Sequence, residues 1–318
     1  MGGSPISSRD VKRYYDDNSH IRSSTNASQV FKEQYMRNEF NPAKIKLPRE
    51  ACDSSFTPNS KGIILAEDFT GSMDSFLHSL IKDDFPRLIK QIYDIGSFDP
   101  HIMFMGVGDV AAGDKAPLQV TQFEADLRML EQLQKLYVEH GGGGNNYESY
   151  ILPWYFAGKH IKMDCWDKRK EKGFLFTFGD EEPTPKLTAH QIKEVFGDND
   201  ELETSFITAE DCLEMASEKF NCYHIILPGY YRSHYEEDTI NPWRELMGGH
   251  VCDLSDHTYL PELVSTILKM YEGISKTDAI AQIQGSEAKK VVSDALKWHE
   301  ENIEISDNSS AEANMEVF

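Results

Sequence analysis

The stretch Gly62-Ile-Ile-Leu-Ala-Glu-Asp-Phe-Thr-Gly-Ser-Met73 joins a short apolar run to three polar residues, Asp68, Thr70 and Ser72, spaced two positions apart. An apolar run of this length between a glycine and a turn signal predicts a buried strand of an α/β sheet. Open α/β sheets place their ligands at the carboxyl ends of strands. One carboxylate and two hydroxyls at such an end suit a hard divalent cation, which prefers oxygen ligands. In the alternative interpretation, one of these residues only caps the following helix.

Apolar runs alternate with amphipathic segments along the rest of the chain. We expect further strands at 101–109, 118–123 (an edge strand), 174–178, 222–227 and 251–254. We expect helices at 76–92 (with Pro86 as a kink or break), 127–140, 147–161, 188–196, 209–220 and 259–271. Strands that alternate with helices predict an α/β fold with a mainly parallel sheet and helices on both faces.

The composition divides the chain into three parts. Residues 1–60 are rich in Ser, Asn and Asp, which predicts an extended N-terminal arm with one short helix near 30–40. Residues 61–275 hold the alternating strands and helices. Residues 276–318 predict a C-terminal helix followed by an acidic, disordered tail, since no Lys or Arg follows Trp298.

Charge and hydropathy exclude several classes of protein. The net charge of −21 argues against a nucleic-acid binder and against attraction to anionic membranes. No apolar run approaches the roughly 20 residues of a membrane span, and the N-terminus shows no apolar signal core. The 5 cysteines form no CxxC pair, which indicates free thiols in a reducing compartment. We therefore expect a cytoplasmic protein.

Two further segments carry polar groups that could join the first. The run Gly141–Gly144 is followed by Asn145 and then Glu148, and Asp180 lies in an acidic cluster after the strand expected at 174–178. In a doubly wound sheet, all three segments project onto one edge. Each has a simpler interpretation when taken alone: a flexible loop for the glycines and a helix N-cap for Asp180.

This ordered triple resembles the von Willebrand factor A (vWA) family and its metal-ion-dependent adhesion site (MIDAS), in the form found in intracellular bacterial and phage members. Asp68, Thr70 and Ser72 match the Asp-x-Ser/Thr-x-Ser element in full. The glycine run with Asn145 and Glu148 is similar to the second element, and Asp180 to the third, although the usual Thr-Asp-Gly order is replaced by Phe-Gly-Asp. The resemblance covers roughly residues 61–271 and implies a Rossmann-like, doubly wound fold.

The resemblance also implies a single Mg²⁺ or Mn²⁺ ion with one position open to the carboxylate of a partner. Thr70 and Ser72 would bind the ion directly, while Asp68 and Asp180 would act mainly through water, because Mg²⁺ keeps several waters. Asn145 departs from the family, since it retains an oxygen but lacks the hydroxyl or the charge found there.

Several acidic residues near these segments are secondary candidates. Asp109 ends the second expected strand, where it would either orient a metal-bound water or shape a turn with nearby glycines. Asp114 is a second candidate of this kind, and the family resemblance adds Glu148. Glu67 lies inside the first strand, so we expect it to face a polar crevice or pair with a base, because an unpartnered buried carboxylate is costly.

These features favour a non-catalytic, metal-dependent protein-interaction module. Its partner would present an Asp or Glu to the metal, and family resemblance adds an adaptor or assembly role, including one beside an AAA+ ATPase. The alternative is a haloacid-dehalogenase-like phosphotransferase in which Asp68 is the nucleophile, Asp180 and Glu181 hold Mg²⁺ and Lys172 neutralises the phosphate. That pattern does not require the Gly141–Glu148 element, and it expects an acidic residue where Thr184 and Pro185 stand.

Overall fold

A six-stranded sheet forms the centre of the protein and is built from the apolar runs of the sequence. The structure is a computed structural model that describes residues 6–139, 147–228 and 239–300. The strand order is β12-β11-β7-β2-β3-β4. The strands are β2 (Ser60–Asp68), β3 (Asp99–Val107), β4 (Leu118–Val120), β7 (Gly173–Gly179), β11 (Phe220–Ile226) and β12 (Val251–Asp253). All neighbours run parallel except β4, which pairs antiparallel with β3 and confirms the predicted edge strand.

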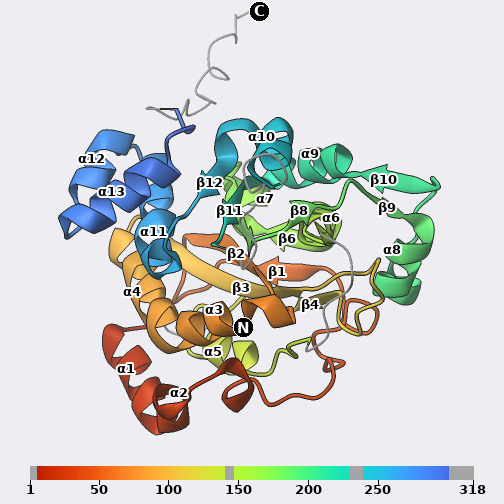
Figure 1. The fold of residues 1–318 in the computed structure, drawn as a ribbon, viewed down its shortest axis with the longest axis horizontal. Coiled ribbons are helices and arrows are strands. Elements are labelled where there is room, and N and C mark those ends of the chain that lie inside the picture. The colour runs from red at the N-terminus through yellow and green to blue at the C-terminus, as the bar shows by residue number, and fades with distance from the viewer. Residues whose placement is uncertain (1–5, 140–146, 229–238, 301–318) are drawn as a thin grey trace, which may run out of the picture.

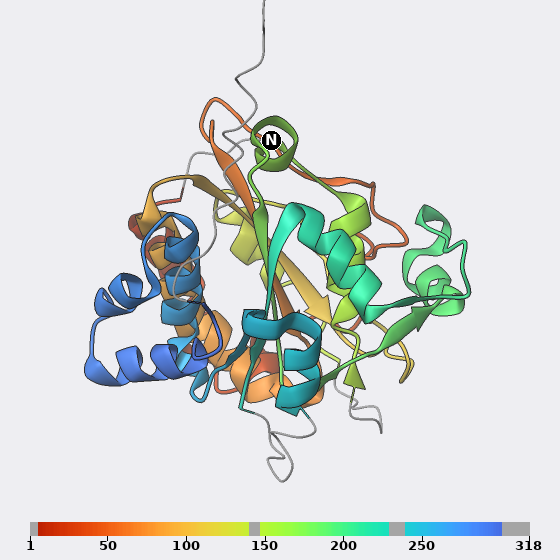
Figure 2. The same ribbon diagram turned by 90° about the horizontal axis from the view of Figure 1, so that it is seen from above.

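Two hydrophobic cores lie on opposite faces of this sheet, as expected for a mixed α/β fold. Ile63 and Leu65 of β2 belong to one core and Ile64 and Ala66 to the other, because successive side chains of a strand point to opposite faces. The helices of the first core include α3 (Asp74–Ser79), α4 (Phe85–Ile95) and α11 (Leu260–Tyr271). Those of the second include α6 (Ile151–His160), α9 (Ala209–Lys219) and α10 (Asn241–Met247). Figures 1 and 2 show helices on both sides of the sheet, and β2 is therefore buried along its whole length.

The other elements surround this centre. The remaining helices are α1 (Ser8–Asp17), α2 (Ser19–Ser23), α5 (Arg128–Leu133), α7 (Asp164–Arg169), α8 (Ala189–Phe196), α12 (Lys276–Ala281) and α13 (Ser286–Ala295). In the described ranges, three strand pairs lie outside the main sheet: β1 (Arg49–Ala51) with β6 (Ile161–Met163), β5 (Tyr147–Glu148) with β8 (Glu182–Pro183), and β9 (Lys186–Thr188) with β10 (Phe206–Thr208). No helix in the described ranges is long and apolar enough to cross a membrane.

The N-terminal residues differ from the prediction. The helix expected near 30–40 is wrong; α1 and α2 lie earlier, and 30–40 contains no helix. Ser7 caps α1 in a capping box with Asp10, which satisfies backbone N–H groups at the helix start. Tyr15 and Ile21 are buried in the first core. Spacing alone did not reveal these helices, because their apolar side chains are few and separated by polar residues.

The helix predicted at 76–92 is present in three parts. A π-helical turn, Leu80–Asp84, separates α3 from α4. Pro86 lies in the first turn of α4, where a missing N–H is tolerated. The irregularity therefore precedes the proline, and the kink we assigned to Pro86 is wrong in its position.

Two other predicted helices are shorter than expected. The helix expected at 147–161 begins only at Ile151, and its first residues form the strand β5. The helix expected at 127–140 is α5, which ends at Leu133. The acidic tail predicted after Trp298 lies, from residue 301 onward, outside the described residues.

Candidate functional site

Asp68 and Thr70 meet at the carboxyl end of β2, as the sequence predicts. Asp68 is fully buried, and its Oδ1 accepts hydrogen bonds from Thr70 N at 2.8 Å and Thr70 Oγ1 at 2.6 Å. Such a bond from a backbone N–H two residues ahead is the usual geometry of an Asp-initiated turn. Ser72 follows in a 3₁₀ turn, Gly71–Met73, but its side chain lies outside what the structure describes.

The sequence analysis did not identify Tyr150, which supports Asp68 from the other side. Tyr150 is fully buried in the second core, and its hydroxyl donates to Asp68 Oδ2 at 3.0 Å. Both oxygens of the carboxyl group are thus held by described residues. A tyrosine is not a typical ligand of a hard cation, so neither its type nor its spacing marked it as part of a site.

Gly179, the last residue of β7, makes room for this tyrosine. A Cβ atom at Gly179 would lie 1.8 Å from the Tyr150 hydroxyl oxygen and 2.3 Å from its Cζ. Only glycine fits there without displacing the ring. The glycine that precedes Asp180, and that departs from the family order, therefore has a packing reason.

Asp180 follows β7, and β7 is the direct neighbour of β2 in the sheet. Its Oδ1 is buried and has no hydrogen-bond partner among the described residues. Burial raises the pKa of Asp180. Burial also raises the pKa of Asp68 to about 7, and the nearby charge of Asp180 adds to the effect, while the bonds from Thr70 and Tyr150 oppose it. The structure therefore brings the first and third predicted elements together.

Glu148 reaches the same region through the small sheet formed by β5 and β8. Glu148 pairs in register with Pro183, and its carbonyl oxygen accepts a bond from Thr184 Oγ1 at 2.7 Å. Its Oε2 is buried without a hydrogen-bond partner in the described ranges. Burial raises the pKa of Glu148 to about 10, with further contributions from acidic neighbours, of which Asp68 is the largest.

Asp109 closes the loop that follows β3. Its carboxylate accepts hydrogen bonds from Ala111 N at 2.8 Å, Ala112 N at 3.1 Å and Ser149 Oγ at 3.2 Å. Its own N–H donates to Asp114 Oδ2 at 2.8 Å. These bonds agree with the interpretation that Asp109 shapes a turn. The bond from Ser149 also links this loop to the residue that follows Glu148. A role for Asp109 toward a metal-bound water stays a prediction.

Other predicted groups have different outcomes. Asn145 and Gly141–Gly144 lie outside the described residues. Glu67 is fully buried, and neither carboxyl oxygen has a partner among those that the structure describes, so the expected base is absent there. Burial, together with the charge of Asp68, raises the pKa of Glu67 well above its usual range. We infer that Glu67 is held as the neutral acid.

The site is strongly acidic. Glu181, next to Asp180, also has a pKa raised to about 7, by burial and by the charges of Asp180 and Glu182. Within the described part of the chain, Asp68, Glu148, Asp180 and Glu181 form no ion pair with a basic side chain. Carboxyl groups placed in this way hold protons or attract a cation.

The oxygen atoms of the predicted site are of the kind that an oxygen-preferring cation binds. They do not all come from carboxylate or imidazole groups. In the described ranges, no three His, Cys, Asp or Glu side chains are placed so that they could hold a metal ion. The predicted site draws instead on hydroxyl and amide oxygens beside Asp68 and Asp180. Asp180 Oδ1 and Glu148 Oε2, which have no hydrogen-bond partner among the described residues, are compatible with such an ion.

The phosphotransferase alternative loses one of its residues. Lys172 lies at the start of β7, and Asp180 directly follows its end. Seven residues of extended chain span about 20 Å. The Lys172 ammonium group instead donates to the carbonyl oxygen of Ser217 at 2.7 Å. Lys172 is therefore not placed to neutralise a phosphate bound at Asp68.

Comparison with known proteins finds distant similarity to solved structures. No family model and no curated protein matches the chain. Among solved structures, the chain is similar to the pilus adhesin SpaC from Lactobacillus rhamnosus GG in its open conformation, with 10% sequence identity and a TM-score of 0.43. The similarity covers 76% of this chain but only 31% of the adhesin chain. A likeness this distant carries no argument about fold or function.

We expect Gly179→Ala to destabilise the protein by about 1–3 kcal/mol, the usual cost of an extra methyl group in a packed interior. The new Cβ would force Tyr150 away from Asp68. Urea denaturation of Gly179→Ala, Tyr150→Phe and the double variant measures this effect. Because both changes break the same hydrogen bond, their costs should sum to more than the cost of the double variant. Strict additivity would contradict the arrangement.

The raised pKa of Glu181 predicts how stability depends on pH. The folded state keeps a proton on Glu181 up to about pH 7, whereas a glutamate in an unfolded chain releases it near pH 4. The free energy of unfolding therefore falls as pH rises through this window. Buried histidines such as His101 and His160, whose pKa values are lowered by burial, act in the opposite direction.

Glu181→Gln isolates the contribution of Glu181. In EDTA, we expect the variant to match the wild type near pH 4, to become progressively more stable than the wild type up to about pH 7, and to keep a constant advantage above it. Urea midpoints measured at intervals from pH 4 to pH 8 check this. A difference that does not change with pH would show that Glu181 ionises normally.

Proposed function

We propose that the chain is a vWA-like, metal-dependent protein-interaction module with a MIDAS-type site. The observation that carries the proposal is the placement of Asp68 with Thr70 and of Asp180 on neighbouring strand ends, with buried carboxyl groups that have no basic partner among the residues that the structure describes. A bound Mg²⁺ or Mn²⁺ ion would supply the missing positive charge.

The strand order supports a doubly wound, Rossmann-like sheet. Numbered in chain order within the main sheet, the strands lie as 3-2-1-4-5-6, which is the order of dinucleotide-binding folds, although strand 3 is antiparallel here. In such sheets, the ligand lies where the order reverses, outside the carboxyl ends of the strands. That point falls between β2 and β7, the strands that lead to Asp68 and Asp180.

The residues would share the work of holding the ion. Thr70 and Ser72 would offer hydroxyl oxygens directly, and Asp68 and Asp180 would accept hydrogen bonds from water on the ion, with Asn145 as a further oxygen donor. Mg²⁺ prefers such a shell of hard oxygen ligands and water. An ion with few direct carboxylate ligands keeps its affinity for an incoming Asp or Glu, which is why we propose an acidic side chain on the partner.

The proposal makes the protein an adaptor or assembly subunit in the cytoplasm, with an AAA+ ATPase as one class of partner. It involves no chemistry on a substrate. The hydrogen bonds at Asp68 favour it over the phosphotransferase: Thr70 and Tyr150 occupy both oxygens of the proposed nucleophile, and Lys172 lies at the far end of β7.

Asp180→Asn tests the site through opposite effects on stability with and without metal. In EDTA, the variant should be more stable than the wild type, because it removes a buried charge that has no partner in the described part of the chain. Mg²⁺ should stabilise the wild type by mass action, by about 2.7 kcal/mol at a concentration 100 times the dissociation constant. The variant should show little or none of this gain in thermal melts.

Glu181→Gln is the matched control for that measurement. It removes a neighbouring carboxyl group whose pKa is also raised, but one that is outside the proposed ligand set. It should gain stability in EDTA and still respond to Mg²⁺. Loss of the response in both variants would indicate general attraction of cations. Phosphatase turnover in the same samples that depends on Asp68 would overturn the proposal in favour of the phosphotransferase.

A further inference from the structure

The N-terminal residues contact the loop that carries the proposed metal ligands. Phe69 lies between Asp68 and Thr70, and Phe31 packs edge-on against its ring with the centroids 5.3 Å apart. Both rings are buried in the first core. The backbone carbonyl of Phe69 also accepts a hydrogen bond from Glu139 N at 2.9 Å. A shift of Phe31 would therefore displace Phe69, which lies in the chain between the proposed ligands Asp68 and Thr70.

A second contact lies on the helical run that follows the loop. The Tyr15 hydroxyl of α1 donates to the carbonyl oxygen of Ile81 at 2.6 Å, in a buried position. Ile81 belongs to the π-helical turn between α3 and α4. Such turns break the regular pattern of helix hydrogen bonds and occur often at functional sites. Tyr15 thus satisfies a backbone carbonyl at the one irregular point of this run.

A third contact ties α2 to the same run. Ser24, the residue after α2, forms a hydrogen bond between its Oγ and His78 Nε2 of α3 at 2.8 Å. Lys82 of the π-helical turn donates to the backbone carbonyl of Ser24 at 3.2 Å. The N-terminal residues therefore form separate hydrogen bonds to α3 and to the π-helical turn.

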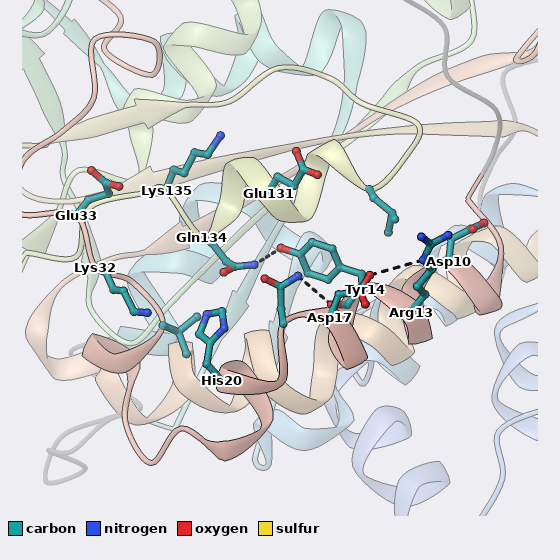
Figure 3. Close-up of a pocket in the computed structure, with 13 residues that line it drawn as sticks. Asp10, Arg13, Tyr14, Asp17, His20, Lys32, Glu33, Glu131, Gln134 and Lys135 are labelled. Carbon is teal, nitrogen blue, oxygen red and sulfur yellow. Dashed lines mark hydrogen bonds and ion pairs between the residues drawn. The ribbon is translucent and has the colours of Figure 1, made fainter.

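A hollow lies between the N-terminal segment and the region of α5. A hollow of about 570 Å³ separates α1 and residues 30–33 from α5, and Figure 3 shows charged side chains around it. Tyr14 crosses it through a hydrogen bond from Gln134 Nε2 to the tyrosine hydroxyl. The buried contacts of this N-terminal segment thus concentrate on the loop and on the helices that follow it.

We propose that residues 6–31 form an intramolecular clamp that fixes the metal loop and the run from α3 to α4, so that release of the clamp weakens the metal site. The expected effect on metal binding rests on the proposed function, whereas the expected effect on amide exchange in residues 69–85 does not. Because binding linkage is reciprocal, a metal ion that prefers the clamped state must also stabilise the clamp. A partner that displaces residues 6–31 would thereby loosen the metal loop.

Hydrogen exchange and Mn²⁺ affinity, measured on the full chain, test the clamp. Tyr15→Phe removes only the hydroxyl bonded to Ile81, and Phe31→Ala removes the ring packed on Phe69. Tyr14→Phe is the matched control, since its hydroxyl is bonded to Gln134 and not to the run after the loop. Amide exchange is followed in EDTA over residues 69–85, and Mn²⁺ binding by titration calorimetry.

Tyr15→Phe should speed exchange in residues 69–85 and weaken Mn²⁺ binding by up to about fivefold, the limit set by the loss of one buried hydrogen bond. Phe31→Ala should have a larger effect on both, and Tyr14→Phe should leave both unchanged. In the wild type, Mn²⁺ should slow exchange in residues 6–31. If Phe31→Ala proves too unstable to study, Tyr15→Phe alone decides the result.

Two results would overturn the inference. One is faster exchange confined to residues 6–31 in both variants, and the other is an unchanged Mn²⁺ affinity despite faster exchange at 69–85. Failure of the proposed function is distinguishable from these, because the wild type would then bind no Mn²⁺ at all. The exchange rates of residues 69–85 in EDTA would still confirm or exclude the mechanical clamp in that case.

Discussion

The structure around the site depends on one buried carboxyl group. Asp68 lies at the end of the central strand, and its oxygens are held by Thr70 on one side and by Tyr150 on the other. Burial of a carboxyl group without a basic partner is unfavourable, and here it raises the pKa to about 7. Asp180, whose buried Oδ1 has no hydrogen-bond partner within the described ranges, adds to this cost. Such a cost is typical of functional sites, where local stability is lower than the fold could provide.

The fold places these groups together because of the order of its strands. β2 has β3 on one side and β7 on the other, and the chain reaches these two neighbours across opposite faces of the sheet. Because β2 and β7 are parallel neighbours, the polar residues that follow each strand lie at the same edge of the sheet. Tyr150 directly precedes α6, and its ring packs so closely against Gly179 that a larger residue would not fit there.

Much of this arrangement could be predicted from the sequence, and the exceptions have physical causes. The apolar runs located every strand of the main sheet, and the polar residues after two of them predicted that Asp68, Thr70 and Asp180 lie at neighbouring strand ends. Tyr150 was missed because its role is to fill space and donate one hydrogen bond, which no ligand pattern encodes. The helices at the N-terminus were missed because they are stabilised by burial against α3 and α4, and local spacing does not report such tertiary contacts.

The loop that carries Asp68 and Thr70 is fixed from several directions. Tyr150 holds it from the second core, Phe31 packs on it from the first, and the run that follows it is tied to α11 through Arg87 and Glu262 at 2.6 Å. These contacts hold the loop in place even though the charge of Asp180 lies near Asp68. A ligand that meets a preorganised site loses less binding free energy to ordering. A bound cation would relieve the repulsion between the carboxylates of Asp68 and Asp180, and a preorganised site would retain that free energy as binding affinity. The same rigidity would keep the ion oriented toward a partner.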